Sequence, residues 1–193
     1  MDNLQKLKQL LKHYKLEGNI STNKKQINDL VEICNNHSFI NILEIGFNAG
    51  HSSVIMLENS NALITSIDIG SHNNYIDLAK KFVDEKYPCR HKLIIGDSNL
   101  LLDTIDDKYD FIFIDGGHDY KTCLNDLTKC RNLATNDYII YMDDLVYENP
   151  KTWNKGVNRV WEEQKEKHFI EEIDYKSFNR GKGRGLCKYI CSI

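Results

Sequence analysis

The sequence predicts a doubly wound α/β fold, in which a mostly parallel seven-stranded sheet ends in a C-terminal antiparallel hairpin and carries helices on both faces. Five apolar runs of strand length alternate with helical patterns between residues 41 and 166. These runs are almost continuously apolar, which is typical of parallel strands buried on both faces. After residue 166 the alternation stops, and two strand-like runs follow with a connection too short for a parallel crossover.

Each element of this fold has its own signal in the chain. The parallel strands are expected at Asn41–Gly46, Leu63–Asp68, Lys92–Asp97, Asp110–Asp115 and Tyr138–Asp143. Helices are expected at about 51–59, 74–86, 98–104, 119–133 and 152–166. The helical segments are indicated by apolar residues that recur every three or four positions. The hairpin strands are expected at Phe169–Tyr175 and Gly185–Ile190.

Two further helices are expected before the first strand. The first has apolar residues at helical spacing, at Leu4, Leu7, Leu11 and Tyr14. It is expected to end at Gly18, and the second is expected to begin after Ser21 or Thr22, which are suitable N-caps. The apolar face of the second comprises Ile27, Leu30, Val31 and Cys34. We therefore predict one domain over residues 1–193, with a helical extension at 1–37 and a core at 38–193.

The composition excludes several classes of function. The formal net charge of −3 gives no electrostatic basis for binding a nucleic acid. The N-terminus lacks the apolar core of a signal peptide, and no apolar run reaches membrane-spanning length, so we expect a cytoplasmic protein with no membrane partner. The six cysteines form no CxxC pair and are expected to be reduced thiols, with Cys187 and Cys191 on one face of the last strand.

Polar residues gather where the predicted strands end, which is where open α/β sheets bind their ligands. Gly46 and Gly50 follow the first strand and allow a tight turn, through which a ligand can approach main-chain N–H groups at the start of a helix. Asp68 ends the second strand and suits the two hydroxyls of a ribose. Asp97 and Ser98 follow the third strand and suit an adenine edge. The acids at the strand ends are Glu44, Asp68, Asp97, Asp115 and Asp143.

The run LEIGFNAGHS at Leu43–Ser52 resembles the glycine loop of class I S-adenosylmethionine-dependent methyltransferases. The chain looks most like the small O-methyltransferases that include catechol O-methyltransferase, caffeoyl-CoA O-methyltransferase and sugar-modifying relatives, over roughly residues 20–190. The resemblance implies a Rossmann-like methyltransferase fold. It also implies that Glu44 and Gly46 line the methionine part of S-adenosylmethionine and that Ser52 meets its carboxylate. The implied cofactor-binding residues are Glu44, Gly46, Phe47, Asn48, Gly50, Ser52, Asp68, Ile69, Asp97, Ser98 and Asp115.

Three acids match the positions that hold a divalent cation in the metal-dependent branch of these enzymes, namely Asp115, Asp143 and Asp144. Carboxylates are hard oxygen ligands that suit Mg²⁺. In the alternative, Asp143 or Asp144 only caps the loop to the next helix. His118 stands where catechol O-methyltransferase has a lysine that is its proposed general base, and an imidazole accepts a proton near neutral pH. Asp115 and His118 are thus the predicted catalytic residues, unless His118 only hydrogen-bonds its own loop.

The predicted function is therefore transfer of a methyl group from S-adenosylmethionine to a hydroxyl of a small polar acceptor, such as a sugar or a nucleotide sugar, with help from a divalent cation such as Mg²⁺. The loop at 145–156 is polar and carries Tyr147 and Trp153, which suits a polyol. His72–Asn74 offer further hydrogen bonds, and Arg180–Arg184 offer charge for a phosphate or else form a solvated hairpin turn.

Several alternatives remain open at this point. The acceptor could be catechol-like or a nitrogen, and the chain could be a non-catalytic S-adenosylmethionine-binding module. A nicotinamide oxidoreductase is disfavoured because the chain has no GxGxxG loop and ends in a hairpin where that class adds a further strand and helix. Relatives are often dimers, which leaves a homodimer open.

Overall fold

The computed structural model describes residues 2–16, 18–71, 75–148, 151–179 and 181–190. His72–Asn74, Arg180 and Cys191 lie outside the described residues, and so do the predictions made for them. The chain divides into two compact units, Met1–Asp97 and Ser98–Ile193.

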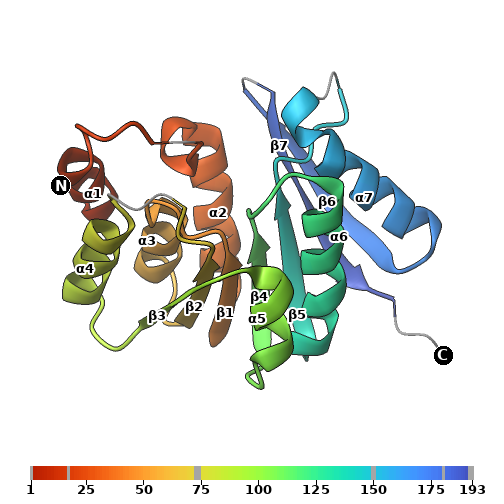
Figure 1. Ribbon diagram of the computed structural model, residues 1–193, viewed down its shortest axis with the longest axis horizontal. Coiled ribbons are helices and arrows are strands. Elements are labelled where there is room, and N and C mark those ends of the chain that lie inside the picture. Colours follow the sequence, from red (N-terminus) through yellow and green to blue (C-terminus); the bar gives the residue numbers. More distant parts are fainter. Residues whose placement is uncertain (1, 17, 72–74, 149–150, 180, 191–193) are drawn as a thin grey trace. The chain divides into compact units, whose positions relative to one another are not determined.

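The first unit contains three parallel strands in the order β3-β2-β1 (Figure 1). The strands are β1 (Asn41–Ile45), β2 (Leu63–Asp68) and β3 (His91–Ile95). The helices are α1 (Asn3–Leu10), α2 (Lys24–Asn36), α3 (His51–Glu58) and α4 (Ile76–Lys86), with a 3₁₀ turn at Ile20–Thr22. Residues 51–57 of α3 are buried all round, so this helix lies in the interior of the unit directly after the glycine loop.

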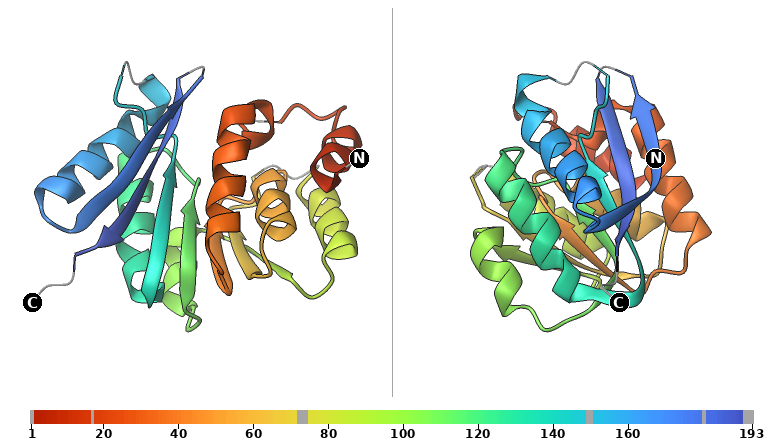
Figure 2. Two further views of the ribbon diagram at one scale, coloured as in Figure 1. Left: turned by 180° about the vertical axis from the view of Figure 1, so that it is seen from behind. Right: turned by 90° about the vertical axis from the view of Figure 1, so that its right-hand side faces the viewer.

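The second unit contains four strands in the order β4-β5-β7-β6, of which β7 runs antiparallel to both its neighbours. The strands are β4 (Tyr109–Ile114), β5 (Ala134–Asp143), β6 (Ile170–Phe178) and β7 (Lys182–Tyr189). The helices are α5 (Ser98–Leu101), α6 (Tyr120–Lys129) and α7 (Lys155–Glu166), and 3₁₀ turns lie at Leu102–Thr104, Cys130–Leu133 and Thr152–Asn154. Helices α6 and α7 pack side by side (Figures 1 and 2).

All seven predicted strands are present, and most of their bounds are right within two residues, because continuous apolar runs mark buried strands well. Strand β3 is an exception to the expected burial, since it is an edge strand and Ile95 is 53% exposed. The predicted hairpin is correct, but β7 begins at Lys182, three residues before the expected start. The five described cysteines are free thiols, of which Cys89 is exposed.

The predictions for the N-terminal helices need correction. Helix α1 ends at Leu10 and does not extend to Gly18. Helix α2 is capped by Asn23, not by Ser21 or Thr22, because the Asn23 side chain accepts hydrogen bonds from two backbone N–H groups of the first turn. The buried face of α2 is also rotated from the predicted one and comprises Gln26, Asp29, Leu30, Ile33 and Cys34.

Candidate functional site

Three residues of the glycine loop in the first unit have a positive backbone angle φ. Gly46 has φ of 98°, Asn48 of 49° and Gly50 of 71°. A Cβ atom on Gly50 would lie 2.9 Å from the ring of Phe47, so backbone conformation and packing both require glycine there. Helix α3 begins at the next residue, and its first N–H groups have no acceptor within the helix. The loop therefore presents main-chain donors at a helix start, as predicted.

Asp68 connects the end of β2 to this loop. Its carboxylate accepts hydrogen bonds from the N–H groups of Asn48, at 2.7 Å, and Gly70, at 2.8 Å. The Asn48 side chain is held in turn by the hydroxyl of Tyr75, at 2.8 Å. Ile69, beside the acid, is 65% exposed and leaves an apolar surface next to a buried carboxylate. A ribose with an adjacent adenine would find both of these features here.

Glu44 lies inside the first unit and not on an open edge. It is completely buried, and three serine hydroxyls donate to its carboxylate, those of Ser52, Ser53 and Ser66, each at 2.5 Å. Burial raises the pKa of Glu44, and the three hydroxyls oppose that rise. The Ser52 hydroxyl is thus engaged with Glu44. Contact of either residue with a cofactor remains a prediction.

Two histidines contact or adjoin the glycine loop, of which His51 is buried and His91 is half-buried. His51 begins α3 directly after Gly50, and the ring of His91 stacks on Phe47 with 5.1 Å between centroids. Burial lowers the pKa of both histidines to about 4. Both are therefore neutral in the folded chain at neutral pH.

The low pKa of His51 predicts a pH dependence of stability. Burial, followed by the charge of Lys8, lowers this pKa from 6.5 to about 4. Between these values the unfolded chain binds a proton that the folded chain does not, so the stabilisation present above pH 6.5 is lost as pH falls towards 4. His51→Gln should remove up to about 1.4 kcal/mol per pH unit of this dependence.

Urea unfolding from about pH 7 to about pH 5 measures the effect, with the exposed His13→Gln as the matched control. An unchanged pH slope in His51→Gln would contradict the assignment.

The predicted adenine turn, Asp97 and Ser98, falls at the boundary between the two units. The N–H of Gly96 donates to the carbonyl of Asp68 at 2.8 Å, which places the start of this turn beside the end of β2. Ser98 is the first residue of α5. Both predicted residues are partly exposed.

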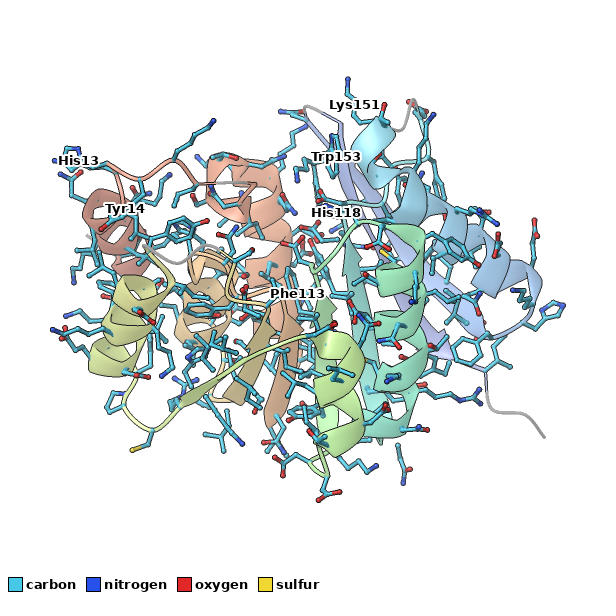
Figure 3. All side chains as sticks on the ribbon, in the orientation of Figure 1. His13, Tyr14, Phe113, His118, Lys151 and Trp153 are labelled. Atoms are coloured by element: carbon cyan, nitrogen blue, oxygen red, sulfur yellow. The ribbon has the colours of Figure 1, made fainter. Side chains whose placement is uncertain are left out.

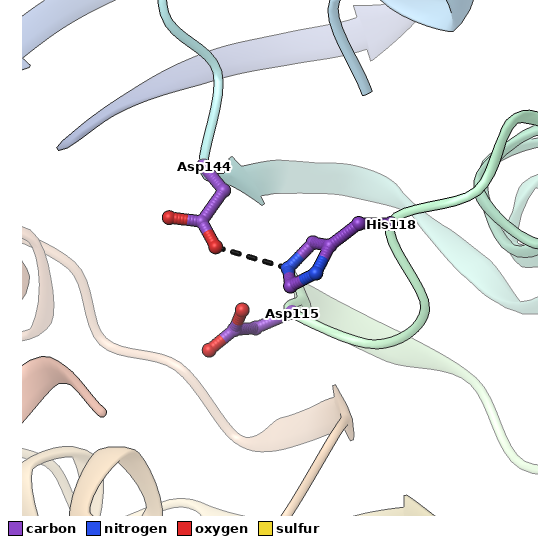
Figure 4. Close-up of side chains that lie close together, drawn as sticks. All are labelled: Asp115, His118 and Asp144. Carbon is purple, nitrogen blue, oxygen red and sulfur yellow. Dashed lines mark ion pairs between the residues drawn. The ribbon is translucent and has the colours of Figure 1, made fainter. Parts of the chain in front are cut away.

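In the second unit, three predicted residues come together (Figure 4). Asp115 follows β4, His118 lies in the loop before α6, and Asp144 follows β5 with φ of 58°. Each offers one ligand atom, and these atoms lie within 4.8 Å of one another. We call this group the acid–histidine cluster. Among the described residues, Asp143 is not part of it: it is buried as the last residue of β5.

His118 and Asp144 form the central pair of the cluster. The Nε2 atom of His118 lies 3.0 Å from Oδ2 of Asp144, a close contact that is an ion pair only when the imidazole is protonated. The His118 side chain is 38% exposed, whereas that of Asp144 is 3% exposed. The imidazole is therefore partly accessible to solvent, whereas the carboxylate is buried.

Lys182 is a member of this site that the sequence reasoning missed. Its Nζ atom donates to Oδ1 of Asp144 at 2.5 Å and lies 4.9 Å from the ring centroid of Trp153. Burial opposes ionisation of Asp144, but its contacts with His118 and Lys182 prevail and hold the pKa of this carboxyl below its ordinary value. The alternation of Lys182 and Arg184, which lie in β7, is the feature of the sequence that indicates a strand at this point.

Two aromatic residues of the predicted acceptor loop differ in their contacts. Trp153 is 43% exposed and contacts His118 edge to face, at 5.1 Å between ring centroids; both residues are labelled in Figure 3. The Tyr147 hydroxyl, by contrast, bonds to Glu172 and accepts from the indole of Trp161. Trp153 is therefore the better candidate for contacting an acceptor.

The two basic side chains of the segment Lys182–Arg184 both form ion pairs. Lys182 pairs with Asp144, and Arg184, which is buried, pairs with Asp174 at 2.8 Å. The suggestion that this segment meets a phosphate loses support, because both described cations already neutralise carboxylates.

A divalent cation fits the donor set of the acid–histidine cluster, since two carboxylates and one imidazole nitrogen are all ligands that such ions accept. The cluster differs from the predicted set in that His118 takes the place of Asp143. A ligand nitrogen of His118 could not at the same time accept a proton, so the two predicted roles of this cluster compete.

A glycine loop at a helix start, an acid at the end of the next strand and a histidine among strand-end carboxylates are together typical of a class I methyltransferase. A family model described as a methyltransferase domain matches residues 43–145, which is more than half of the chain, and the chain belongs to this family. The predicted identification and enzyme class, a small S-adenosylmethionine-dependent methyltransferase, are confirmed. No curated protein matches the chain in sequence.

Solved structures confirm the predicted fold. The O-methyltransferase TomG from Streptomyces achromogenes, involved in tomaymycin synthesis and bound to S-adenosylmethionine, has a TM-score of 0.76 at 17% identity, with 98% of this chain and 90% of that one covered. The methyltransferase PaMTH1 of Podospora anserina, bound to S-adenosylhomocysteine, has a TM-score of 0.78 at 17% identity, with 99% and 89% covered. An O-methyltransferase from Bacillus cereus, in complex with S-adenosylhomocysteine, has a TM-score of 0.73 at 16% identity, with 96% and 89% covered. Among the described helices, none is long and apolar enough to cross a membrane.

Proposed function

We propose that this methyltransferase transfers the methyl group of S-adenosylmethionine to a hydroxyl of a small polar acceptor, such as a sugar or a nucleotide sugar. The observation that carries the proposal is the acid–histidine cluster, in which an accessible imidazole is paired with a buried carboxylate. A hydroxyl must lose a proton as it attacks, whereas a neutral amine is already nucleophilic. A base of this kind therefore favours oxygen over nitrogen as the acceptor atom.

The donor would be held by residues of the first unit and by the turn that follows β3. S-adenosylmethionine supplies an electrophilic methyl group on a sulfonium. The N–H groups at the start of α3 would meet its carboxylate, Asp68 its ribose hydroxyls, and Ile69 its adenine. The turn at Asp97 and Ser98 would complete the adenine side, and Asp115 would face the donor, as the resemblance implies.

The transfer itself is an in-line displacement in which the C–S bond breaks as the C–O bond forms. His118 would take the proton of the acceptor hydroxyl, and the Asp144 carboxylate would stabilise the resulting imidazolium. Asp115 and Asp144 would hold a divalent cation, without Asp143, which lies outside the acid–histidine cluster. Such an ion lowers the pKa of a bound hydroxyl. Trp153 would pack on the apolar face of a sugar ring.

We also propose that residues 1–193 work as one methyltransferase domain, with the core at 38–193 and the helical extension at 1–37. The coverage of 96–99% of this chain by the solved structures supports this proposal. A cytoplasmic location and a homodimeric assembly remain predictions.

Loss of the Asp68 carboxylate should weaken donor binding. Asp68→Ala is expected to lower the affinity for S-adenosylmethionine by about 10- to 100-fold, the usual range for lost hydrogen bonds to a charged group. Calorimetric titration measures this change. Asp77→Ala, which removes an exposed carboxylate nine residues later in the first turn of α4, is the control. Equal affinities of Asp68→Ala and wild type would exclude the ribose role.

The acceptor class is tested by a methyl-transfer screen over free sugars, nucleotide sugars, catechols and amines, each with Mg²⁺ and with a chelator. We expect product on a sugar hydroxyl and a loss of rate on chelation. Transfer to amines alone, or to no acceptor in the presence of bound donor, would contradict the proposal.

A further inference from the structure

Lys182 lies at the start of β7, where it contacts the same carboxylate that the acid–histidine cluster needs for a cation. Its Nζ atom lies 2.5 Å from Oδ1 of Asp144, while His118 occupies the side of Oδ2. Each oxygen of this buried carboxylate therefore already lies close to a side-chain nitrogen.

The surroundings hold the ammonium in place. The carboxylates of Asp144, Asp143 and Asp115 attract its positive charge. The ring of Trp153 adds a cation–π contact at 4.9 Å.

The backbone that carries Lys182 is also fixed. A Cβ atom on the next residue, Gly183, would lie 2.3 Å from the carbonyl oxygen of Leu145 and 3.0 Å from that of Lys176. The start of β7 therefore packs directly against the segment that follows Asp144, and Lys182 pairs with Phe178 in the hairpin register. The fold of the second unit therefore fixes the contact of Lys182 with Asp144. The Lys182 side chain is 26% exposed.

We propose that Lys182 is the tethered cation of the acid–histidine cluster, and that a divalent cation binds there only by displacing its ammonium from Asp144. The inference relies on the proposed function only for the cluster as the place where a cation would act. Lysine has no lone pair to offer a metal while it is charged, so it can only compete with the ion for the carboxylate. Lys182 would thus set how much divalent cation the enzyme needs.

The test is a Mn²⁺ titration, followed by electron paramagnetic resonance of the free ion, on the full chain without donor or acceptor. Lys182→Gln should bind Mn²⁺ tighter than wild type by roughly tenfold or more, because a unit positive charge next to the ligand is removed. Lys182→Arg keeps the charge and should stay within about twofold of wild type. Lys188→Gln is the matched control, since Lys188 lies on the same strand and pairs with a different carboxylate, Asp137.

Two further measurements keep the outcomes separate. In an Asp144→Asn background, Lys182→Gln should no longer increase the affinity, because the shared carboxylate is gone. Thermal melting confirms that each variant is folded, and Lys182→Met replaces Lys182→Gln if the latter is not. The inference is overturned if the folded Lys182 variant binds Mn²⁺ no tighter than wild type does. It is also overturned if neither the variant nor the wild type binds Mn²⁺. A wild-type chain that binds Mn²⁺ as inferred but transfers no methyl group would instead contradict the proposed function.

Discussion

Replacement of His118 by alanine is expected to lower the turnover number of methyl transfer by about 10²- to 10⁴-fold, the usual range for loss of a general base. The imidazole is the accessible partner of a buried carboxylate, so its removal leaves Asp144 in place but takes away the proton acceptor. The expected loss is in turnover, while the affinity for S-adenosylmethionine stays near that of wild type. Steady-state kinetics with a saturating donor measure the change.

Two controls distinguish a base from a metal ligand or a structural residue. Added imidazole should restore part of the activity of His118→Ala if the lost group only accepted a proton. The Mn²⁺ affinity of the variant should also remain within a few-fold of wild type, because a base does not hold the ion. Activity above about a tenth of wild type would contradict the assignment of His118 as the base.

A methyl group added at Gly156 should be the most damaging small change near the site. A Cβ atom there would lie 2.2 Å from the carbonyl oxygen of His118 and 2.7 Å from the backbone nitrogen of Tyr120. These are backbone atoms that cannot swing aside, so α7 must move away from the loop that carries His118. We expect Gly156→Ala to lower the free energy of unfolding by about 3 kcal/mol, at the upper end of the overpacking range.

The melting temperature of Gly156→Ala should fall by roughly 6–12 °C for a domain of this size. Its turnover should also fall at temperatures where it is fully folded, because the His118 loop is displaced. Lys155→Ala, one residue earlier and exposed, is the control and should change stability by no more than about 0.5 kcal/mol. Melting of Gly156→Ala within about 1 °C of wild type would show that the helix is not packed against the loop as described.

The strands and the positions of the acids were predictable because both depend on local sequence. A continuous apolar run that ends in an acid fixes a buried strand and the residue at its carboxyl end, whatever follows in the chain. Asp68 and Asp115 were found in this way, and both lie where a strand ends. The weakest local predictions were at the N-terminus, where Asn23 was overlooked as a cap next to Ser21 and Thr22.

The partners of these acids could not be predicted, because they depend on strand register. Glu44 faces Ser66 only because β1 and β2 pair in the register that places them opposite each other. Lys182 reaches Asp144 across 38 residues of chain, through the antiparallel pairing of β7 with β5. The exclusion of Asp143 from the acid–histidine cluster likewise follows from where β5 ends.

The most direct test of the account is a titration of the ¹⁵N-labelled chain with S-adenosylhomocysteine, followed by the amide signals. If the donor lies at the strand ends of the first unit, the signals of Gly46, Asn48, Ser52 and Ile69 should shift strongly. The signals of Asp97 and Ser98 should shift with them, at the same midpoint. Shifts confined to other parts of the chain, or no shift at saturating ligand, would contradict the central claim.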